Sequence, residues 1–390
     1  MDRYRILTLD GGGAWALIEV MTLIDLFGEA TTGHQVLREF DMVAANSGGG
    51  IVLGGLVEDM PLGTLRDFFL DEEKRKSIFV RKSLHLPGLE KYDTEAKLAG
   101  LRNAFPKRGD MALTEAAKDI PGRSSGVPVH LLVAGFDYDR NRGAFFRSAP
   151  ASREGFGQGA AGQATIAEVI HASSNAPIRY FDRPAELPSQ PGKRYWDGAI
   201  SGANNPILMA ISEAVVLGQS PLRLAALSIG TGTTFLPFAP EGAEDAAIYQ
   251  TIHRSGLTTD LEKLAGAILD DPPDVASFMA HVMTGGPPAD ATSPADSCIV
   301  LMSPMIAPVL NADNKFVLPN GMDEDAFDNL VKMDMDAVDQ DEVDEIVNFA
   351  QLWLAGSISN QPVRAAADLT PEIGQGRYAL AKEAWKGLTS

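Results

Sequence analysis

Ser47 is the residue whose surroundings best fit nucleophilic chemistry. A serine hydroxyl is a weak nucleophile at neutral pH, so a catalytic serine needs a tight turn, a nearby base and amide donors. Residues 41–45 can form a strand, and the glycines at 48–50 lead into an apolar run that can form a helix. This order predicts a nucleophile elbow, in which the positive end of the helix points at the hydroxyl. The competing interpretation is a glycine-rich turn in which Ser47 only caps a helix.

A glycine loop near the start of the chain offers the amide donors. Residues 6–9 are predicted to be a buried strand, Gly11, Gly12 and Gly13 a tight turn, and residues 15–27 a helix. Because it has no side chains, such a loop can turn several N–H groups into one small volume. That arrangement suits a bound phosphate or a developing oxyanion.

The same loop also satisfies the G-x-G-x-x-A form of the dinucleotide-binding fingerprint. That interpretation requires a second strand ending in an acidic residue that holds a ribose. The next strand ends at Asn46 and Ser47 instead, and Glu39 and Asp41 lie near its start. A dinucleotide-binding oxidoreductase is therefore the weakest of three hypotheses for function.

Asp197 is an acidic residue that can approach another loop closely. It ends an aromatic run, Tyr195 and Trp196, and is followed by Gly198 and Ala199, so no bulky neighbour shields it on that side. The alternative interpretation is an ordinary Asp-Gly turn in a hairpin.

Composition limits the class of protein. The chain has 390 residues and a formal charge of −19, which argues against binding nucleic acid or an anionic membrane through bulk electrostatics. Cys298 is the single cysteine, which excludes an intrachain disulfide and fits a reducing compartment. We find no secretory signal and no apolar stretch long enough to span a bilayer, and we expect a soluble, cytoplasmic protein.

One basic cluster stands out in this acidic chain: Lys74, Arg75, Lys76, Arg81 and Lys82, interleaved with phenylalanines. It is a candidate for transient contact with lipid headgroups. The favoured interpretation is a solvated helix face with its aromatic residues in the core. The two interpretations differ in whether the cations are free to reach a surface.

An acidic run between residues 334 and 344 raises the question of calcium. The spacing departs from an EF-hand loop, because Val338 and Asp339 stand where an oxygen ligand and a glycine are needed. We reject a metal site there and expect no metal or cofactor. Asp339 and Glu342 instead form the pattern of a capping box, which predicts a helix from there to Gly356.

We expect a single domain over residues 1–390. The candidate functional motifs lie in a catalytic core at 1–240, and 241–390 is predicted to be a mostly helical extension packed on that core. The apolar run at 298–302 can return to the sheet. A glycine-rich run at 155–162 is predicted to be a surface loop.

Five stretches resemble, in the same order, motifs of the patatin-like phospholipase family. They are Asp10-Gly11-Gly12-Gly13, Asn46-Ser47-Gly48-Gly49, residues 172–177, Trp196-Asp197-Gly198-Ala199 with Ala203-Asn204-Asn205-Pro206, and residues 227–232. The resemblance covers roughly the first 230 residues and rests on the order of the motifs.

This resemblance implies an α/β fold, a three-layer α/β/α sandwich with a mostly parallel sheet. It also implies a Ser47–Asp197 dyad without histidine, which hydrolyses acyl esters of lipids, including phospholipids, through an acyl-enzyme. In that scheme Asp197 accepts the Ser47 proton, and the amides of Gly11, Gly12 and Gly13 form the oxyanion hole. A carboxylate of ordinary pKa is a poor base for serine, so desolvation and alignment must help.

Two departures from the family pattern bear on activity. Ala45 replaces the first glycine of Gly-x-Ser-x-Gly, and Trp15 and Ala16 replace the arginine and glycine usual after the glycine loop. Without that arginine, a neutral ester, a thioester or a galactolipid becomes a more plausible substrate. The first hypothesis is a lipid acyl hydrolase. The second is a binding or regulatory protein that keeps the fold and has lost turnover.

Overall fold

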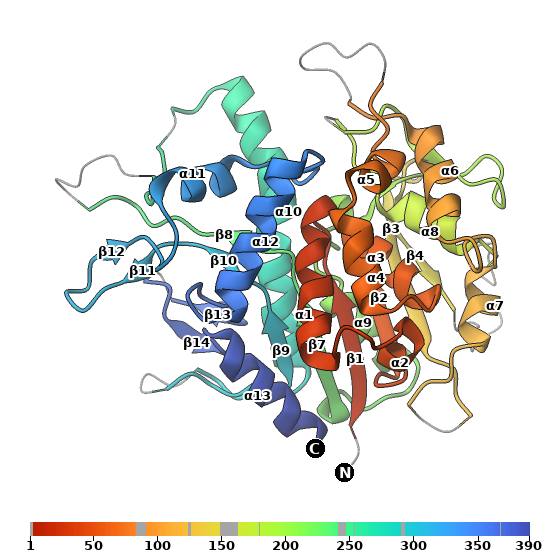
Figure 1. The fold of residues 1–390 in the computed structure, drawn as a ribbon. Helices are drawn as coiled ribbons and strands as arrows, with labels where there is room; N and C mark the ends of the chain where they lie inside the picture. Colours follow the sequence, from red (N-terminus) through yellow and green to blue (C-terminus); the bar gives the residue numbers. More distant parts are fainter. Residues whose placement is uncertain are drawn as a thin grey trace.

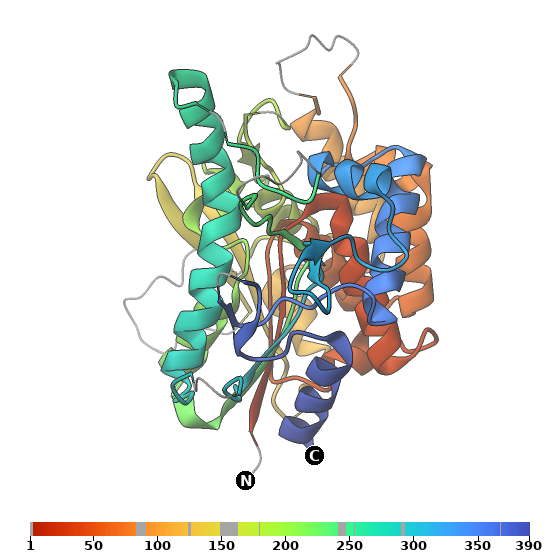
Figure 2. The same ribbon diagram turned by 90° about the vertical axis from the view of Figure 1, so that its left-hand side faces the viewer.

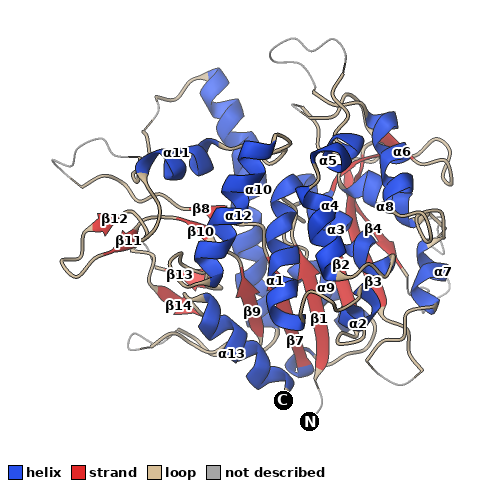
Figure 3. Cartoon of the chain, in the orientation of Figure 1, coloured by secondary structure: helices blue, strands red, loops and turns tan. Residues whose placement is uncertain are grey.

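A computed structural model gives the fold of the chain. It describes residues 3–82, 91–123, 126–148, 163–178, 180–240, 247–252, 254–289, 293–366 and 368–390. The glycine-rich run predicted to be a loop at 155–162 lies outside these residues. Strands occupy the centre of the molecule and helices surround them (Figure 3).

Eight of the described strands form one central sheet. Its order is β5-β6-β3-β2-β1-β7-β9, with β4 also paired to β3. The bounds are β1 (Tyr4–Leu9), β2 (Met42–Ala45), β3 (His130–Asp137), β4 (Arg142–Arg147), β5 (Ala185–Glu186), β6 (Arg194–Asp197), β7 (Leu224–Ile229) and β9 (Ile299–Met302). The pairs β3–β2, β2–β1, β1–β7 and β7–β9 are parallel. The pairs β3–β4, β3–β6 and β5–β6 are antiparallel. The predicted mostly parallel sheet is confirmed.

Helices cover both faces of this sheet (Figures 1 and 2). One face is covered by α9 (Ile207–Val216) and α10 (Leu257–Met283). The other is covered by α1 (Leu17–Phe27), α3 (Ser47–Val57), α4 (Leu62–Leu70), α8 (Ile166–Ser173), α12 (Gln340–Leu354) and α13 (Tyr378–Thr389). The other α-helices are α2 (Gly33–Leu37), α5 (Glu72–Ile78), α6 (Thr94–Ala104), α7 (Leu113–Lys118) and α11 (Glu324–Lys332). The three-layer α/β/α sandwich is therefore confirmed.

Alternation along β1 explains why the sheet needs both layers of helices. Leu7 and Leu9 are fully buried in the core beneath α1 and α3, whereas Ile6 is fully buried in the core beneath α9. A strand that is apolar on both sides is typical of a parallel sheet buried between helices. The same pattern places β1 at the middle of the sheet.

The two edges of β3 decide where β2 and β6 meet. Leu132 and Val133 pair with both β2 and β4, so these two strands lie on opposite edges of β3. Gly135 pairs with both β4 and β6, so β6 lies on the same edge as β2. Ala45 at the end of β2 is opposite Val133, and Asp197 at the end of β6 is opposite Gly135. The two strands thus approach each other end to end, two β3 residues apart, which is roughly 7 Å along a strand.

The chain beyond residue 240 joins the sheet as well as covering it. The apolar run predicted to return to the sheet does so as β9, which pairs in parallel with β7. Short strands form three further pairs: β8 (Thr233–Thr234) with β10 (Met305–Ile306), β11 (Val309–Leu310) with β12 (Phe316–Val317), and β13 (Arg364–Ala365) with β14 (Pro371–Ile373). The extension thus contributes strands as well as helices.

Helix α12 begins where the capping pattern placed it. Asp339 and Glu342 form the predicted capping box, and the helix ends before Gly356, whose φ of 88° no other residue type adopts easily. Its buried face carries Val343, Ile346 and Trp353 and packs against α1. Local sequence therefore determines both ends of this helix.

Removing one large side chain from α12 tests this packing. Trp353 is fully buried, and its ring centre lies 4.6 Å from that of Tyr378 in α13. We expect Trp353→Ala to lower the free energy of unfolding by about 3–5 kcal/mol, measured by urea denaturation, because it leaves a cavity. The control Val216→Ala removes a side chain that is 69% exposed on α9 and should change little. Equal losses for both variants would contradict the packing.

Candidate active site

Ser47 lies at a sharp turn between β2 and α3. Its backbone has a φ of 48°, a left-handed conformation that few residues other than glycine adopt. Asn46 before it is extended, with φ −135° and ψ 146°, and α3 starts at Ser47 itself. The Ser47 amide donates a hydrogen bond of 2.9 Å to the Ser173 hydroxyl of α8, which holds the turn in place. Strand, turn and helix follow one another as the sequence pattern predicted.

Close backbone contacts explain the small residues of the turn. A Cβ atom on Gly49 would lie 2.5 Å from the Leu9 carbonyl oxygen, and one on Gly48 would lie 2.6 Å from the Gly13 carbonyl oxygen. Ala45, in contrast, is fully buried in β2 and its methyl group packs in the core. The alanine that departs from the usual motif is therefore accommodated without strain.

The structure places Asp197 and Ser47 side by side. The Ser47 hydroxyl lies close enough to the Asp197 carboxyl group to lower its pKa. One carboxyl oxygen of Asp197 also accepts hydrogen bonds from the Asn46 side-chain amide at 3.1 Å and from the Ala199 backbone amide at 2.9 Å. Asp197 is only 3% exposed, so these donors define its surroundings. An alcohol therefore lies beside a buried carboxyl group that two other donors hold in place.

Burial controls the protonation of this carboxyl group. Removal from water raises the pKa of Asp197 above its ordinary value. The hydrogen bonds from Ala199, Ser47 and Asn46 favour the charged form and oppose that rise in pKa. The result is a stronger base than an exposed aspartate, held in a fixed orientation.

Lys97 is a buried cation behind the dyad that the sequence did not reveal. Its ammonium group donates to the His171 carbonyl at 3.0 Å and to the Ser174 hydroxyl at 3.4 Å, and lies 4.0 Å from the centre of the Phe181 ring. Burial lowers the pKa of Lys97 well below its usual value, while the negative charge of Asp197 raises it. No local pattern around Lys97 signals this role, because its partners lie on α8 and beyond.

The glycine loop contacts the dyad from the other side. The Gly11 amide donates to the Asn204 carbonyl at 2.8 Å, so this amide is already engaged. Gly11 instead permits close approach, since a Cβ atom there would lie 3.2 Å from the Ser47 Cβ and 2.8 Å from the Asn46 side-chain nitrogen. The Gly12 and Gly13 amides have no acceptor among the residues that the structure describes. Those two are the free donors of the loop.

The remaining motifs meet at the same place. Ser173 donates to the Asn46 side-chain oxygen at 3.3 Å, and the Asn175 carbonyl accepts the Asp197 amide at 3.1 Å. Thr231, after β7, donates its hydroxyl to the Gly11 carbonyl at 2.8 Å. The sequence analysis did not assign a role to Asn46 itself, although it stands beside the candidate nucleophile.

Ser47 lies at a small, partly open pocket of about 20 Å³, room for roughly one water molecule. Apolar walls come from Ile51, Phe79 and Phe181, and Met335 and Asp336 from the C-terminal part of the chain line it as well. A larger hollow of about 920 Å³ lies among residues 294–384 and shares no lining residue with this pocket. The candidate nucleophile therefore lies at the smaller of these two pockets.

Comparison with known proteins identifies the family. The family model for patatin-like phospholipases matches residues 7–211, more than half of the chain. The chain belongs to the patatin-like phospholipase family. A curated relative, the cGAMP-activated phospholipase of Pseudomonas aeruginosa (strain BWHPSA011 / Pa011), is 30% identical over 151 residues. That match covers 37% of this chain and 40% of the relative, so this chain matches about two fifths of the relative's length.

A solved structure shows a more distant likeness. The crystal structure of VipD from Legionella pneumophila aligns over 90% of this patatin-like chain and 67% of its own, with 10% identity and a TM-score of 0.37. Family membership thus rests on the family model and on the motifs that it spans.

Trp15 replaces the expected arginine and has a structural role of its own. Its indole N–H donates to the Asp334 carbonyl at 3.2 Å, and its ring packs edge-on against Phe349 of α12, 6.2 Å between centres. The neighbouring Ala14 amide donates to the Met335 carbonyl at 3.0 Å. The departure from the family motif therefore attaches the C-terminal part of this patatin-like protein to its glycine loop.

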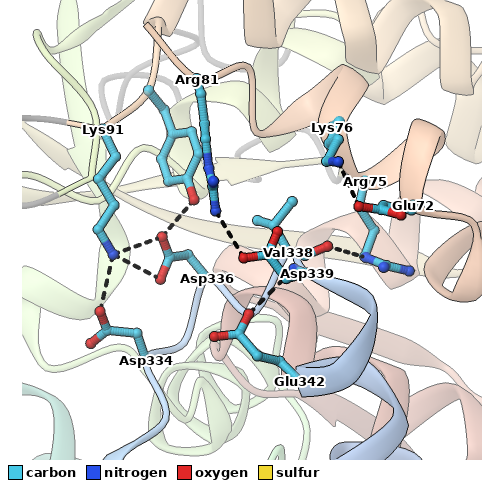
Figure 4. Close-up of polar contacts among 11 residues, drawn as sticks. Glu72, Arg75, Lys76, Arg81, Lys91, Asp334, Asp336, Val338, Asp339 and Glu342 are labelled. Carbon is cyan, nitrogen blue, oxygen red and sulfur yellow. Dashed lines mark hydrogen bonds and ion pairs between the residues drawn. The ribbon is translucent and has the colours of Figure 1, made fainter. Parts of the chain in front are cut away.

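The predicted basic cluster is largely paired within the molecule. Arg75 is buried and donates to the Val338 carbonyl at 3.1 Å, and Arg81 pairs with Asp339 at 3.3 Å. Lys76 pairs with Glu72 along its own helix, as Figure 4 shows. Phe68 and Phe69 are buried, as the favoured interpretation required. The cations are thus engaged by protein groups and do not form a free patch.

The acidic run pairs with these cations. Among the described residues, no group of three or more acidic, histidine or cysteine side chains could hold a metal ion. In the same part of the chain, no helix is both long and apolar enough to cross a bilayer.

Two neighbouring glycines of α3 provide a matched test of the turn. Gly49→Ala places a methyl group against the Leu9 and Asp10 carbonyls, so we expect a large loss of unfolding free energy or of soluble protein. Gly50→Ala meets nothing nearer than 3.9 Å. It should leave stability unchanged or raise it by about 0.5–1 kcal/mol, because alanine favours helices. Thermal unfolding of both variants decides this, and equal stability would contradict the close approach of α3 to β1.

Proposed function

We propose that this protein is a serine acyl hydrolase that cleaves ester bonds of lipids, with Ser47 as nucleophile and Asp197 as base. The observation that carries the proposal is the position of the Ser47 hydroxyl beside Asp197, a buried carboxyl group that Asn46 and Ala199 hold in place and whose pKa the hydroxyl lowers. Membership of the patatin-like phospholipase family supports the class of reaction. No metal or cofactor enters the proposed steps.

Acylation begins with attack of the Ser47 oxygen on the ester carbonyl carbon while Asp197 accepts the hydroxyl proton. The carbonyl oxygen becomes an oxyanion, which the free amides of Gly12 and Gly13 stabilise. The intermediate collapses, and the leaving alcohol takes the proton from Asp197. An acyl group remains on Ser47.

Deacylation repeats the same proton transfers with water. Asp197 removes a proton from a water molecule, the resulting hydroxide attacks the acyl carbon, and the Gly12 and Gly13 amides again bind the oxyanion. Ser47 leaves as the alcohol after taking the proton from Asp197, and a fatty acid is released. Gly11 contributes through close packing, since its amide is bound to the Asn204 carbonyl.

The surroundings of the pocket favour a substrate with an apolar acyl chain. Ile51, Phe79 and Phe181 supply apolar walls beside Ser47. Trp15 stands where the family pattern has an arginine, a cation that could bind a phosphate group of the substrate. Substrate binding at this end of the glycine loop therefore does not require a phosphate. Both a neutral lipid ester and a phospholipid ester therefore fit the reaction.

Covalent labelling tests the nucleophile directly. A fluorophosphonate probe should label the wild type and Ser212→Ala, a control that removes a surface serine of α9, but not Ser47→Ala. Asp197→Asn should lower hydrolysis of a short chromogenic ester by at least about a thousandfold, the usual cost of losing a catalytic base. Labelling that persists in Ser47→Ala would overturn the assignment. Lipid binding without labelling or turnover would favour the regulatory-protein hypothesis.

The pH dependence of kcat/KM tests the base. The carboxylate form of Asp197 is the active one, so activity should fall as pH drops through its pKa, which burial raises above 3.8. Asn46→Ala removes a donor that lowers this pKa, and we expect the acid limb to move to higher pH. An acid limb that stays in place or moves to lower pH would contradict Asp197 as the base.

A further inference from the structure

A strap of the C-terminal chain, residues 334–339, crosses the mouth of the Ser47 pocket. Met335 and Asp336 line that pocket together with Ser47. The strap runs directly into α12. Figure 4 shows Asp334 and Asp336 facing Lys91, and Asp339 facing Arg81. The strap therefore lines the site and also pairs with cations that follow α5 in the chain.

Backbone hydrogen bonds hold the strap at three points. The Met335 carbonyl accepts the Ala14 amide at 3.0 Å, the first amide after the glycine loop. The Asp334 carbonyl accepts the Trp15 indole at 3.2 Å. Arg75 donates to the Val338 carbonyl at 3.1 Å. The strap thus lies on the same loop that offers the proposed oxyanion donors.

Ion pairs hold its side chains. Lys91 contacts Asp334 at 3.0 Å and Asp336 at 3.1 Å, and the Tyr92 hydroxyl donates to Asp336 at 2.6 Å. Arg81 contacts Asp339 at 3.3 Å, and both side chains of that pair are more than half exposed. Exposed ion pairs are weak and exchange readily with other anions. The outer part of the strap is therefore held by replaceable contacts.

The small size of the pocket requires the strap to move before a lipid ester can reach Ser47. A volume of about 20 Å³ cannot admit an acyl chain. Displacing Met335 and Asp336 would open the pocket and free the Ala14 amide. The contacts that must yield are the ion pairs of Lys91 and Arg81 and the hydrogen bonds that Ala14 and Trp15 donate to the strap.

An exposed apolar residue lies two positions before Tyr180, which lines the pocket. Ile178 is 72% exposed and has a φ of 73°, a conformation that is strained for a β-branched residue. It belongs to the loop of Tyr180, whose ring centre lies 5.6 Å from the Lys91 ammonium. Cations beside an exposed apolar side chain are the chemistry that binds the headgroup region of a lipid surface.

We infer that an anionic phospholipid surface opens this site by giving Lys91 and Arg81 phosphate partners in place of the strap carboxylates. The surface would also repel the strap, because Asp334, Asp336 and Asp339 are all acidic. The local cations and Ile178 make this contact despite a net charge of −19 for the chain. The inference rests on the proposed lipid acyl hydrolase function and adds the condition under which the site becomes accessible.

The test compares two double variants that each remove two negative charges. Asp334→Asn with Asp339→Asn loosens the strap, and asparagine at 339 still caps α12. Asp139→Asn with Asp110→Asn is the control, because those residues pair with Arg194 and Arg102, which are not the cations that pair with the strap. Each protein is assayed on a soluble short-chain ester alone, with phosphatidylglycerol vesicles, with phosphatidylcholine vesicles and with inorganic phosphate.

We expect phosphatidylglycerol vesicles to raise wild-type and control activity, and phosphatidylcholine or phosphate to leave both unchanged. The strap variant should be about fivefold more active without lipid, the effect of losing two exposed ion pairs. It should then respond less to vesicles. Equal stimulation by phosphate alone, or equal basal activity of strap and control variants, would overturn the inference.

Two further measurements keep the inference testable if no ester is hydrolysed. Hydrogen exchange of the amides at 334–339 and at Ala14 should speed up when phosphatidylglycerol vesicles are added to the wild type. Ile178→Asn, which leaves the strap contacts intact and suits a left-handed backbone, should co-sediment less with those vesicles. Unchanged exchange or unchanged sedimentation would refute the gate, whereas absent turnover with faster exchange would refute only the proposed activity.

Discussion

The shared edge of β3 is the constraint on which the site depends. β2 must stop at Ala45, and β6 must arrive from the opposite direction and stop at Asp197, since both pair with the same side of β3. Only then does the first residue of α3 meet the last residue of β6. The proximity of Ser47 and Asp197 is thus a consequence of strand order and register rather than of any local sequence.

The close approach of the start of α3 to the end of β6 leaves almost no room for side chains. A Cβ atom on Gly198 would lie 2.4 Å from the Asn46 side-chain oxygen, and one on Gly49 would meet the backbone of β1. The left-handed φ of Ser47 aims its hydroxyl into the remaining space. Small residues and a strained turn are therefore geometric requirements of this junction, and Ala45 is tolerated because it lies inside the strand, outside the closest contacts.

Exclusion of water joins the electrostatics of the site to its architecture. Asp197 and Lys97 are both buried, so each charge acts in a medium that screens it poorly. The strap adds to this exclusion, and it comes from a part of the chain beyond residues 7–211 that the family model spans. Trp15 links the two parts, which gives a physical reason for a residue that otherwise breaks the family pattern.

The sequence by itself determined the features that depend on neighbouring residues. Hydrophobic periodicity, the glycine loop, the turn at Ser47 and the capping box of α12 were all predictable, because their hydrogen bonds and burial follow from patterns a few residues long. The order of the motifs was enough to place Ser47 and Asp197 in one site. Only the tertiary structure showed that the Gly11 amide donates a hydrogen bond to the Asn204 carbonyl and that Lys97 lies behind the dyad. It alone also placed the strap over the pocket, because contacts between residues hundreds of positions apart are fixed by packing and leave no local pattern in the chain.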